Sequence, residues 1–321
     1  MHGTIPTLDD VRAAARRISP YVHRTPIVVS RTLDDELDAT VFFKCENLQK
    51  VGAFKARGAT NAVLRLDETA ARRGVVTHSS GNHGAALAYA ARTRGIPCVV
   101  VMPTDAPATK VRAVRGYGAE VMLCERPLRE ETCRRLVSER GLVLIHPFEH
   151  PDVVAGQGTA ALELLDEVGE LDLVVAPVGG GGLLTGSTIT LRALCPRSEI
   201  WGAEPEVVDD ARRSLESGEH QPAVADPRSW SDGLLTRLGT LAFEVLRGAG
   251  VRVVTVSEAE TLRAAWDIAQ RMKLVVEPSG ATVLAALRAC AGEIAGRRVG
   301  AIFSGGNTDF AWLADPALRR E

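Results

Sequence analysis

Lys55 is the residue whose type and setting most directly suggest chemistry. It lies among small and mostly apolar neighbours, in the run Val51-Gly52-Ala53-Phe54-Lys55-Ala56, and the chain has 38 cationic residues of which only five are lysines (44, 50, 55, 110 and 273). A desolvated amine loses its proton and can form a Schiff base, whereas a guanidinium cannot. From these residues alone, a covalent role and an ordinary lysine at the end of a loop or helix are equally good interpretations.

A second candidate is the polar turn Ser79-Ser80-Gly81-Asn82-His83-Gly84, which follows an expected strand and opens an expected helix. Such a turn presents hydroxyls, backbone N–H groups and the positive end of a helix dipole, and so suits a carboxylate or phosphate. Helix capping by serine or asparagine is the simpler alternative. Two serines, an asparagine and two glycines exceed what a cap requires, which favours an anion site.

A glycine loop, Gly179-Gly180-Gly181-Gly182, also stands between an expected buried strand and a helix. Without side chains, its backbone can wrap closely around a phosphate. The loop is not a nucleotide P-loop, because no Gly-Lys-Ser/Thr closes it, and it fits a dinucleotide fingerprint poorly. A tight turn that serves only packing remains the alternative.

Two weaker signals come from a serine near the C-terminus and from a group of acidic residues. Ser304 ends the last expected strand, at the edge where open α/β sheets bind ligands. Glu204, Asp209 and Asp210 are oxygen donors suited to Mg²⁺ or Ca²⁺. Their spacing favours helix capping at least as strongly as metal binding.

The elements that must position these residues alternate between strands and helices, which predicts parallel sheets covered by helices. After a capped helix at 7–18, a strand at 41–44 and a helix at 57–66, the first series has strands 75–78, 97–102, 119–123 and 142–145 with helices 84–94, 107–117 and 128–140. A second series begins near Pro151, with helices 156–168, 183–194, 258–271 and 279–291, strands 172–178, 199–204, 251–256 and 298–303, and a short C-terminal helix. The stretch 206–250 is expected to be less regular.

Composition narrows the class of protein. The 321 residues are 45% hydrophobic and 24% charged, with a net charge of −2 and no basic block, which argues against nucleic acid and anionic membranes as partners. No apolar run approaches membrane-spanning length. The six cysteines are scattered without Cys-x-x-Cys, which favours reduced thiols in a cytoplasmic protein.

In combination, these motifs resemble the fold type II pyridoxal-phosphate enzymes, and within them the serine/threonine dehydratase and serine racemase family. The likeness runs from about residue 10 to 312. It is carried by the stretches Lys44 to Gln49, Gly52 to Ala59, Ser79 to Gly84, Gly179 to Gly182, Arg271 to Lys273, Glu277-Pro278 and Ser304 to Asn307.

The resemblance implies pyridoxal 5′-phosphate as cofactor and a role for each site residue. Lys55 would form the Schiff base with the cofactor and take the α-proton. The other cofactor contacts implied are Phe54 on the ring, Asn82 on the 3′-oxygen, Gly179 to Gly182 on the phosphate, Ser304 on the pyridine nitrogen, and Glu277. Ser79, Asn82 and His83 would receive the substrate carboxylate.

The same resemblance implies more about subtype and partners. Ser80 would be the second acid–base residue of a racemase, and Glu204, Asp210 and the carbonyl of Val208 would bind Mg²⁺ (or Ca²⁺ or Mn²⁺). Ala53 replaces the serine of the common Gly-Ser-Phe-Lys version. The resulting Gly-Ala-Phe-Lys is similar to the branch that acts on serine and 3-hydroxyaspartate. The family further implies a homodimer, a large cofactor-binding domain of residues 1–73 plus 148–321, and a small domain of residues 74–147.

The expected reaction is β-elimination of water from an L-hydroxyamino acid (serine, threonine or threo-3-hydroxyaspartate), giving a 2-oxo acid and ammonia, together with serine racemisation. Three alternatives stay open from the sequence. These are a β-replacement transferase of the cysteine synthase type, a nucleotide-binding oxidoreductase that uses the glycine loops, and a non-catalytic ligand-binding relative.

Overall fold

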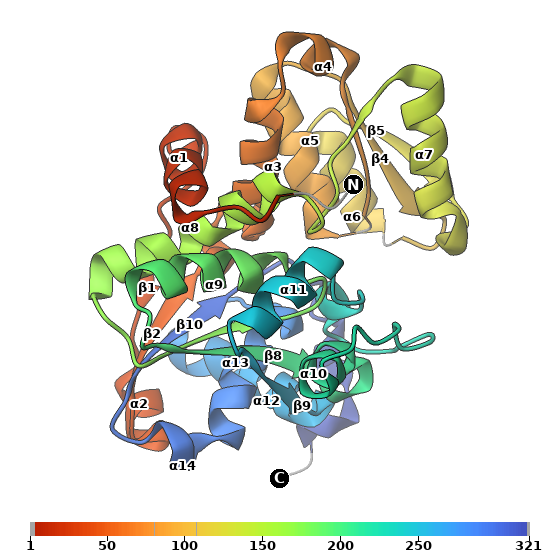
Figure 1. Cartoon of the computed structure of the whole chain (residues 1–321). Helices are drawn as coiled ribbons and strands as arrows, with labels where there is room; N and C mark the ends of the chain where they lie inside the picture. The colour runs from red at the N-terminus through yellow and green to blue at the C-terminus, as the bar shows by residue number, and fades with distance from the viewer. Residues whose placement is uncertain (1–3, 80, 107, 320–321) are drawn as a thin grey trace.

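The computed structural model describes residues 4–79, 81–106 and 108–319, which form two parallel-sheet units (Figure 1). Ten strands are assigned within these residues: β1 (Ile27–Val28), β2 (Thr40–Cys45), β3 (Val75–His78), β4 (Cys98–Pro103), β5 (Glu120–Cys124), β6 (Val143–Leu144), β7 (Leu173–Pro177), β8 (Glu199–Pro205), β9 (Arg252–Val256) and β10 (Arg298–Phe303). The α/β class with parallel sheets flanked by helices is therefore confirmed.

Helices surround both sheets. The α-helices are α1 (Leu8–Ile18), α2 (Arg31–Leu37), α3 (Lys55–Arg65), α4 (Glu68–Arg73), α5 (Asn82–Arg94), α6 (Ala108–Gly116), α7 (Arg129–Arg140), α8 (Pro151–Val168), α9 (Gly182–Leu194), α10 (Asp210–Ser217), α11 (Thr240–Gly248), α12 (Glu258–Asp267), α13 (Pro278–Ala289) and α14 (Ala291–Ile294). No helix among the described residues is long and apolar enough to span a bilayer.

The large sheet has the strand order β1-β2-β10-β7-β8-β9, and every pair is parallel except β1 with β2. Successive residues of β7 pack into different cores: Leu173 and Val175 join one, Val174 and Ala176 the other. Burial on both faces explains why this strand reads as an unbroken apolar run.

The small sheet has the order β5-β4-β3-β6, with all pairs parallel. It lies above the large sheet in Figure 1, with α8 and α9 crossing between them. The expected small domain, 74–147, encloses all four of these strands. Helix α3 packs its Ala59, Ala62 and Val63 against α5 of this unit. The domain bounds themselves stay a prediction.

Helix α8 packs against both α3, which begins at Lys55, and α9, which begins at Gly182. A Cβ on Gly156 would lie 2.6 Å from the Gly58 Cα in α3, and one on Gly158 would lie 2.7 Å from the Gly186 carbonyl oxygen in α9. The Gly58 N–H, in the first turn of α3, also donates to the Gln157 side-chain oxygen at 3.1 Å. Because the glycine contacts are between backbones, α8 fixes α3 and α9 relative to each other.

Several element predictions need correction. The helix expected over 156–168 begins earlier, because Pro151 is the first residue of α8, a position that proline tolerates since its missing N–H is not needed there. The helix expected over 258–271 changes to a π-helix (η6, Ile268–Met272). The expected C-terminal helix consists of two 3₁₀ turns, η7 (Ala311–Ala314) and η8 (Pro316–Arg319). The short elements β1, α2 and α4 were missed.

Candidate active site

Lys55 is the first residue of α3, and its side chain lines a cavity of about 500 Å³ between the two units. Its Nζ donates a hydrogen bond to the backbone carbonyl oxygen of Pro147 at 2.9 Å and lies 5.0 Å from the centre of the Phe54 ring. Burial lowers the pKa of this amine to about 8, as its apolar neighbours predicted. A pKa of about 8 leaves about a tenth of the Lys55 amine neutral at pH 7, and this neutral fraction can act as a nucleophile or base.

The glycine loop lies at the C-terminal end of β7 and opens α9, so the N–H groups of the first turn of α9 face the same cavity. Side chains are excluded here: a Cβ on Gly180 would lie 2.2 Å from the Phe148 ring, and one on Gly179 would lie 2.9 Å from the Leu234 Cα. Gly181 also has φ +86°, which glycine adopts without strain. This cradle fits a phosphate group.

Ser304 reaches the cavity from the C-terminal end of β10. Its carbonyl oxygen accepts the Phe54 N–H at 3.0 Å, so the residue before Lys55 is held against the end of the sheet. The Ser304 and Phe54 side chains line the cavity together with Lys55 and the glycine loop. The structure thus brings together an amine, an aromatic ring, a hydroxyl and an anion cradle.

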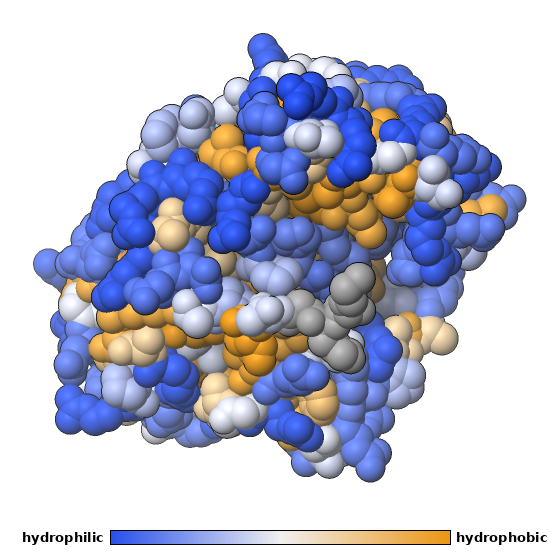
Figure 2. Space-filling model, turned by 45° about the horizontal axis from the view of Figure 1, so that its top comes forward, coloured by the Kyte–Doolittle hydropathy of each residue, from blue (hydrophilic) through white to orange (hydrophobic). Residues whose placement is uncertain are grey.

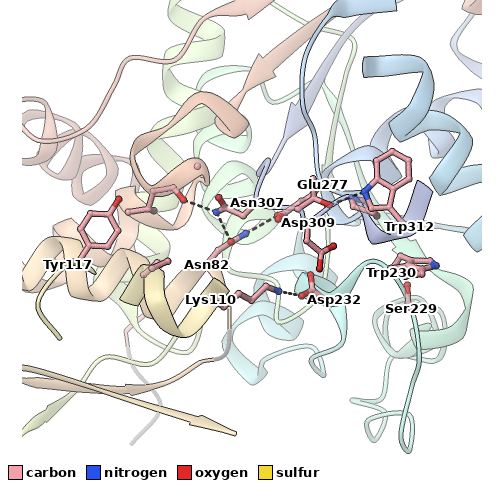
Figure 3. A pocket seen from close by; sticks show the side chains of 17 residues that line it. Asn82, Lys110, Tyr117, Ser229, Trp230, Asp232, Glu277, Asn307, Asp309 and Trp312 are labelled. Atoms are coloured by element: carbon pink, nitrogen blue, oxygen red, sulfur yellow. Dashed lines mark hydrogen bonds and ion pairs between the residues drawn. The ribbon is translucent and has the colours of Figure 1, made fainter. Parts of the chain in front are cut away.

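Asn82 and Glu277 line both this cavity and a second one, whose side chains are drawn in Figure 3. Asn82 Nδ2 donates to Glu277 Oε1 at 2.8 Å, and Asn82 Oδ1 accepts from Asn307 Nδ2 at 2.9 Å. Burial, with a smaller contribution from the Asp232 charge, raises the pKa of Glu277 to about 8. Glu277 is therefore largely protonated at neutral pH.

Ser79, in the turn before α5, and His83, in the first turn of α5, line the cavity. His83 Nε2 lies 3.1 Å from the Ile145 carbonyl oxygen, which can only accept, so Nε2 carries the proton and Nδ1 is a bare acceptor. Burial lowers the pKa of His83 well below its ordinary value. Its side chain is thus poorly suited to a carboxylate, whereas the N–H groups at the start of α5 suit one. Ser80 lies outside the described residues.

The second cavity, of about 640 Å³, is lined from α5, α6 and the segments around 230, 277 and 309. Lys110 of α6 and Asp232 of η5 (Asp232–Leu234) line both cavities and form an ion pair with each other (Figure 3). The space-filling view shows the surface hollowed between the two units, with apolar surface on the upper wall (Figure 2). Both cavities belong to this inter-unit region.

Several residues of the first cavity were missed by the sequence motifs, among them the cationic or titratable side chains His78, Arg126, Arg129 and His146. Burial, and then the neighbouring Arg126 charge, lowers the pKa of Arg129. No motif spacing joins these four side chains, since they come from β3, the end of β6 and the segment that leads into α7. Only the arginines within residues 125–135 could have signalled a basic contribution to the site.

A buried ionic network around Arg57 fixes the first turn of α3, which begins with Lys55. Arg57 donates to Glu46 Oε2 and to Glu163 Oε1, both at 2.7 Å, and Lys44 Nζ donates to Glu163 Oε2 at 2.7 Å. Two cations thus meet two carboxylates, with Arg57 and Glu46 fully buried. The motif residues Lys44 and Glu46 therefore have a structural role in holding the segment that carries Lys55.

The expected metal ligands lie apart from this cavity, at the C-terminal end of β8. Both oxygens of Glu204 accept backbone N–H groups, from Ala211 and Arg212 at 3.0 Å each. Burial raises the pKa of Glu204 to about 8, and burial also raises that of Asp210. Neither carboxyl forms an ion pair among the described residues.

Val208 ends the 3₁₀ turn η4 (Glu206–Val208) between these two carboxyls. Asp209 pairs instead with Arg212 and Arg213 at 3.0 and 2.8 Å. Among the residues that the structure describes, no group of three or more His, Cys, Asp or Glu side chains is arranged to hold a metal. Glu204 and Asp210 fit a hard cation in their donor type, but they provide only two side-chain donors.

Lys55, the glycine cradle and the Ser304 hydroxyl line one cavity of a two-unit α/β fold. This arrangement is that of a pyridoxal-phosphate enzyme. The family model "Pyridoxal-phosphate dependent enzyme" matches residues 18–305, and the chain belongs to this family, with the fold type II arrangement. It is 46% identical to a serine racemase of Dictyostelium discoideum, over 96% of this chain and 97% of that protein. It is 47% identical to a beta-hydroxyaspartate dehydratase of Paracoccus denitrificans, over 95% and 97%.

Comparison with solved structures supports the same family. The chain is similar to the crystal structure of a threonine deaminase from T.th., with a TM-score of 0.91 and 46% identity over 95% of this chain and all of that one. The predicted family is therefore confirmed, and the nucleotide-binding oxidoreductase alternative is excluded.

Proposed function

We propose that this protein catalyses pyridoxal-phosphate-dependent β-elimination of water from L-hydroxyamino acids, serine, threonine or threo-3-hydroxyaspartate, giving a 2-oxo acid and ammonia. The observation that carries the proposal is the convergence of Lys55, the glycine loop and Ser304 on one cavity. The relatives named for serine, hydroxyaspartate and threonine chemistry support the substrate class.

Pyridoxal phosphate, when bound, withdraws electrons from the α-carbon of the amino acid and makes its proton acidic. The backbone of Gly179 to Gly182 would hold the phosphate, the Ser304 hydroxyl would meet the pyridine nitrogen, and Phe54 would contact the ring. Asn82, already oriented by Glu277, donates toward the 3′-oxygen. The neutral Ser304 hydroxyl leaves the pyridine nitrogen largely unprotonated, which favours elimination over transamination.

The Lys55 amine accepts the α-proton, since its lowered pKa gives it a neutral fraction near physiological pH. The Ser79 hydroxyl and the N–H groups at the start of α5 bind the substrate carboxylate, and His83 contributes through its backbone. Arg129, at the α7 side of the cavity, suits the second carboxylate of 3-hydroxyaspartate.

Ser80 is proposed as the acid–base residue on the opposite face from Lys55, which adds serine racemisation. Ser80→Ala is then expected to remove racemisation and elimination from D-serine while elimination from L-serine persists. Chiral analysis of the remaining serine measures this. Equal loss of every activity contradicts a two-base arrangement.

Glu204, Asp210 and the Val208 carbonyl are proposed to bind Mg²⁺, with Ca²⁺ or Mn²⁺ as substitutes. Two adjacent buried carboxyls with raised pKa values support a cation, which would favour their ionised forms. Added Mg²⁺ is expected to raise the Tm of the wild type and not that of Glu204→Gln. An equal response in both proteins contradicts the site.

A homodimer is proposed from the family, and a cytoplasmic location from the six cysteines, all of which are free. The partners are small amino acids, with no nucleic acid or membrane. A β-replacement transferase of the cysteine synthase type and a non-catalytic relative are the remaining alternatives.

The test is product analysis of the cofactor-loaded protein with L-serine, D-serine, L-threonine and L-threo-3-hydroxyaspartate, with and without Mg²⁺. The proposal predicts equal amounts of 2-oxo acid and ammonia from at least one L-hydroxyamino acid. Turnover only of O-acetylserine with sulfide would identify the transferase instead. No turnover of any substrate would identify a silent relative.

A further inference from the structure

His146 is a half-buried imidazole of the Lys55 cavity that the proposed reaction does not yet use. It follows β6 and precedes Pro147, whose carbonyl oxygen holds the Lys55 amine at 2.9 Å. Its side chain lines the same cavity as Lys55, His78 and Arg129. His146 is therefore the residue next to Pro147, whose carbonyl oxygen orients the Lys55 amine.

Two backbone donors fix the tautomer of His146. The Glu149 N–H donates to His146 Nδ1 at 3.0 Å, and the Phe148 N–H approaches the same atom at 3.4 Å. Nδ1 must therefore be the unprotonated acceptor, and a neutral ring then carries its proton on Nε2. Among the described residues, Nε2 has no hydrogen-bond partner.

Packing keeps this ring neutral and in place. His146 lies edge-to-face with His78 at 5.3 Å and with Phe148 at 4.7 Å between ring centres. Burial first, and then His78, Lys55 and His150, lowers the pKa of His146 to about 3. At neutral pH, Nε2–H is thus a fixed hydrogen-bond donor that does not release its proton.

We propose that the Nε2–H of His146 donates a hydrogen bond to the β-hydroxyl of the substrate and stabilises the negative charge that develops as the C–O bond breaks. This inference rests on the proposed elimination. The electron pair left by the α-proton forms the new double bond between the α- and β-carbons, and the electron pair of the C–O bond goes to the departing oxygen. The proton that completes water comes from Lys55, which has taken the α-proton, and His146 keeps its own.

Two amide substitutions separate the donor role of His146 from a purely structural role. In His146→Gln, the amide nitrogen can replace the Nε2–H donor but not the Nδ1 acceptor. In His146→Asn, the amide oxygen can replace the Nδ1 acceptor but not the donor. The proposal predicts that kcat/KM for L-serine falls about 10- to 100-fold in His146→Asn, the size of one hydrogen bond to a charged group, and less than about tenfold in His146→Gln.

His150 provides a matched control. Its Nδ1 accepts the Asp152 N–H at 3.2 Å, a local contact of the same kind on the same segment, but His150 is not among the residues that line the cavity. His150→Gln should therefore lower Tm without the loss in kcat/KM that His146→Asn shows. A loss in His150→Gln equal to that in His146→Asn would assign the effect to the segment and overturn the proposal.

The leaving group supplies the readout that a structural role would not move. Chloride departs from β-chloro-L-alanine without needing a hydrogen-bond donor, so His146→Asn should lose less than about threefold with this substrate. Equal loss with L-serine and β-chloro-L-alanine overturns the inference about His146. Absence of wild-type turnover with both compounds instead overturns the proposed function, and the inference with it.

A measurement without turnover tests the same geometry. In ¹⁵N-histidine-labelled protein, with the signal assigned through His146→Gln, the proposal predicts a neutral ring protonated on Nε2 between pH 5 and 8. The titratable groups whose charges act on the ring are His78, Lys55 and His150, and His83 is near enough for His146 to lower its pKa. A ring protonated on Nδ1, or a charged ring in this range, would overturn the proposal.

Discussion

The Lys55 amine donates to the Pro147 carbonyl oxygen at 2.9 Å, which joins the start of α3 to the segment between β6 and α8. The partner is a neutral oxygen, and burial is the cause of the lowered pKa. A carboxylate in this place would have held the amine in its charged form. This contact therefore orients Lys55 and leaves it reactive.

The first prediction follows from that pKa. Apoprotein should take up pyridoxal phosphate through Lys55 at a rate that rises with pH and has its midpoint near 8, since only the neutral amine attacks. Stopped-flow absorbance of the bound cofactor measures this rate. A midpoint near 10.5, the value of an ordinary lysine, would contradict the effect of burial.

Glu277 gives a prediction about stability. Its folded pKa of about 8 exceeds the ordinary 4.5, so between these values the folded protein binds more protons than the unfolded chain. The contribution of Glu277 to the free energy of unfolding should therefore fall as pH rises from 4.5 to 8. Glu277→Gln should reduce this slope in urea titrations of the apoprotein. An unchanged slope in the variant would show that Glu277 is ionised when folded.

The buried ionic network predicts a large cost for one substitution. Glu163→Ala leaves Arg57 and Lys44 with a single buried carboxylate, and should lower the free energy of unfolding by about 3–5 kcal/mol. Glu170→Ala is the matched control, because its pair with Arg197 is exposed and is worth less than about 1 kcal/mol. Similar costs for both variants would mean that the network does not stabilise the start of α3.

The glycine contacts of α8 predict a linked effect on stability and cofactor binding. Gly156→Ala places a Cβ 2.6 Å from the Gly58 Cα, so it should cost about 1–3 kcal/mol and weaken cofactor binding by displacing α3. Gly292→Ala in α14 meets no atom within 4 Å and should be near neutral. Retention of cofactor affinity in a destabilised Gly156→Ala would contradict the link to Lys55.

Some elements of the fold leave a local pattern in the amino-acid sequence, and others do not. The parallel sheets were predictable because each strand and helix has its own apolar pattern, and the glycine loop and Ser304 were predictable because parallel strands end at one edge. The π-helix η6 and the two-residue strand β1 were not, since tertiary packing overrides or shortens the local pattern.

The residues of the candidate site likewise include some that lie in recognisable motifs and some that do not. Lys55, Asn82 and Gly179 to Gly182 lie in recognisable stretches. His146 and Arg129 acquire their positions only when β6 and α7 pack beside the cavity. The Lys110–Asp232 ion pair joins residues 122 apart in the chain, and neither lies in a motif.

The most direct measurement of the central claim is borohydride reduction of the cofactor-loaded protein, followed by peptide mass spectrometry. Reduction makes the bond between cofactor and lysine permanent. The account predicts the phosphopyridoxyl group on Lys55 and on none of the other four lysines, 44, 50, 110 and 273. Attachment at one of those lysines, or at none, would contradict it.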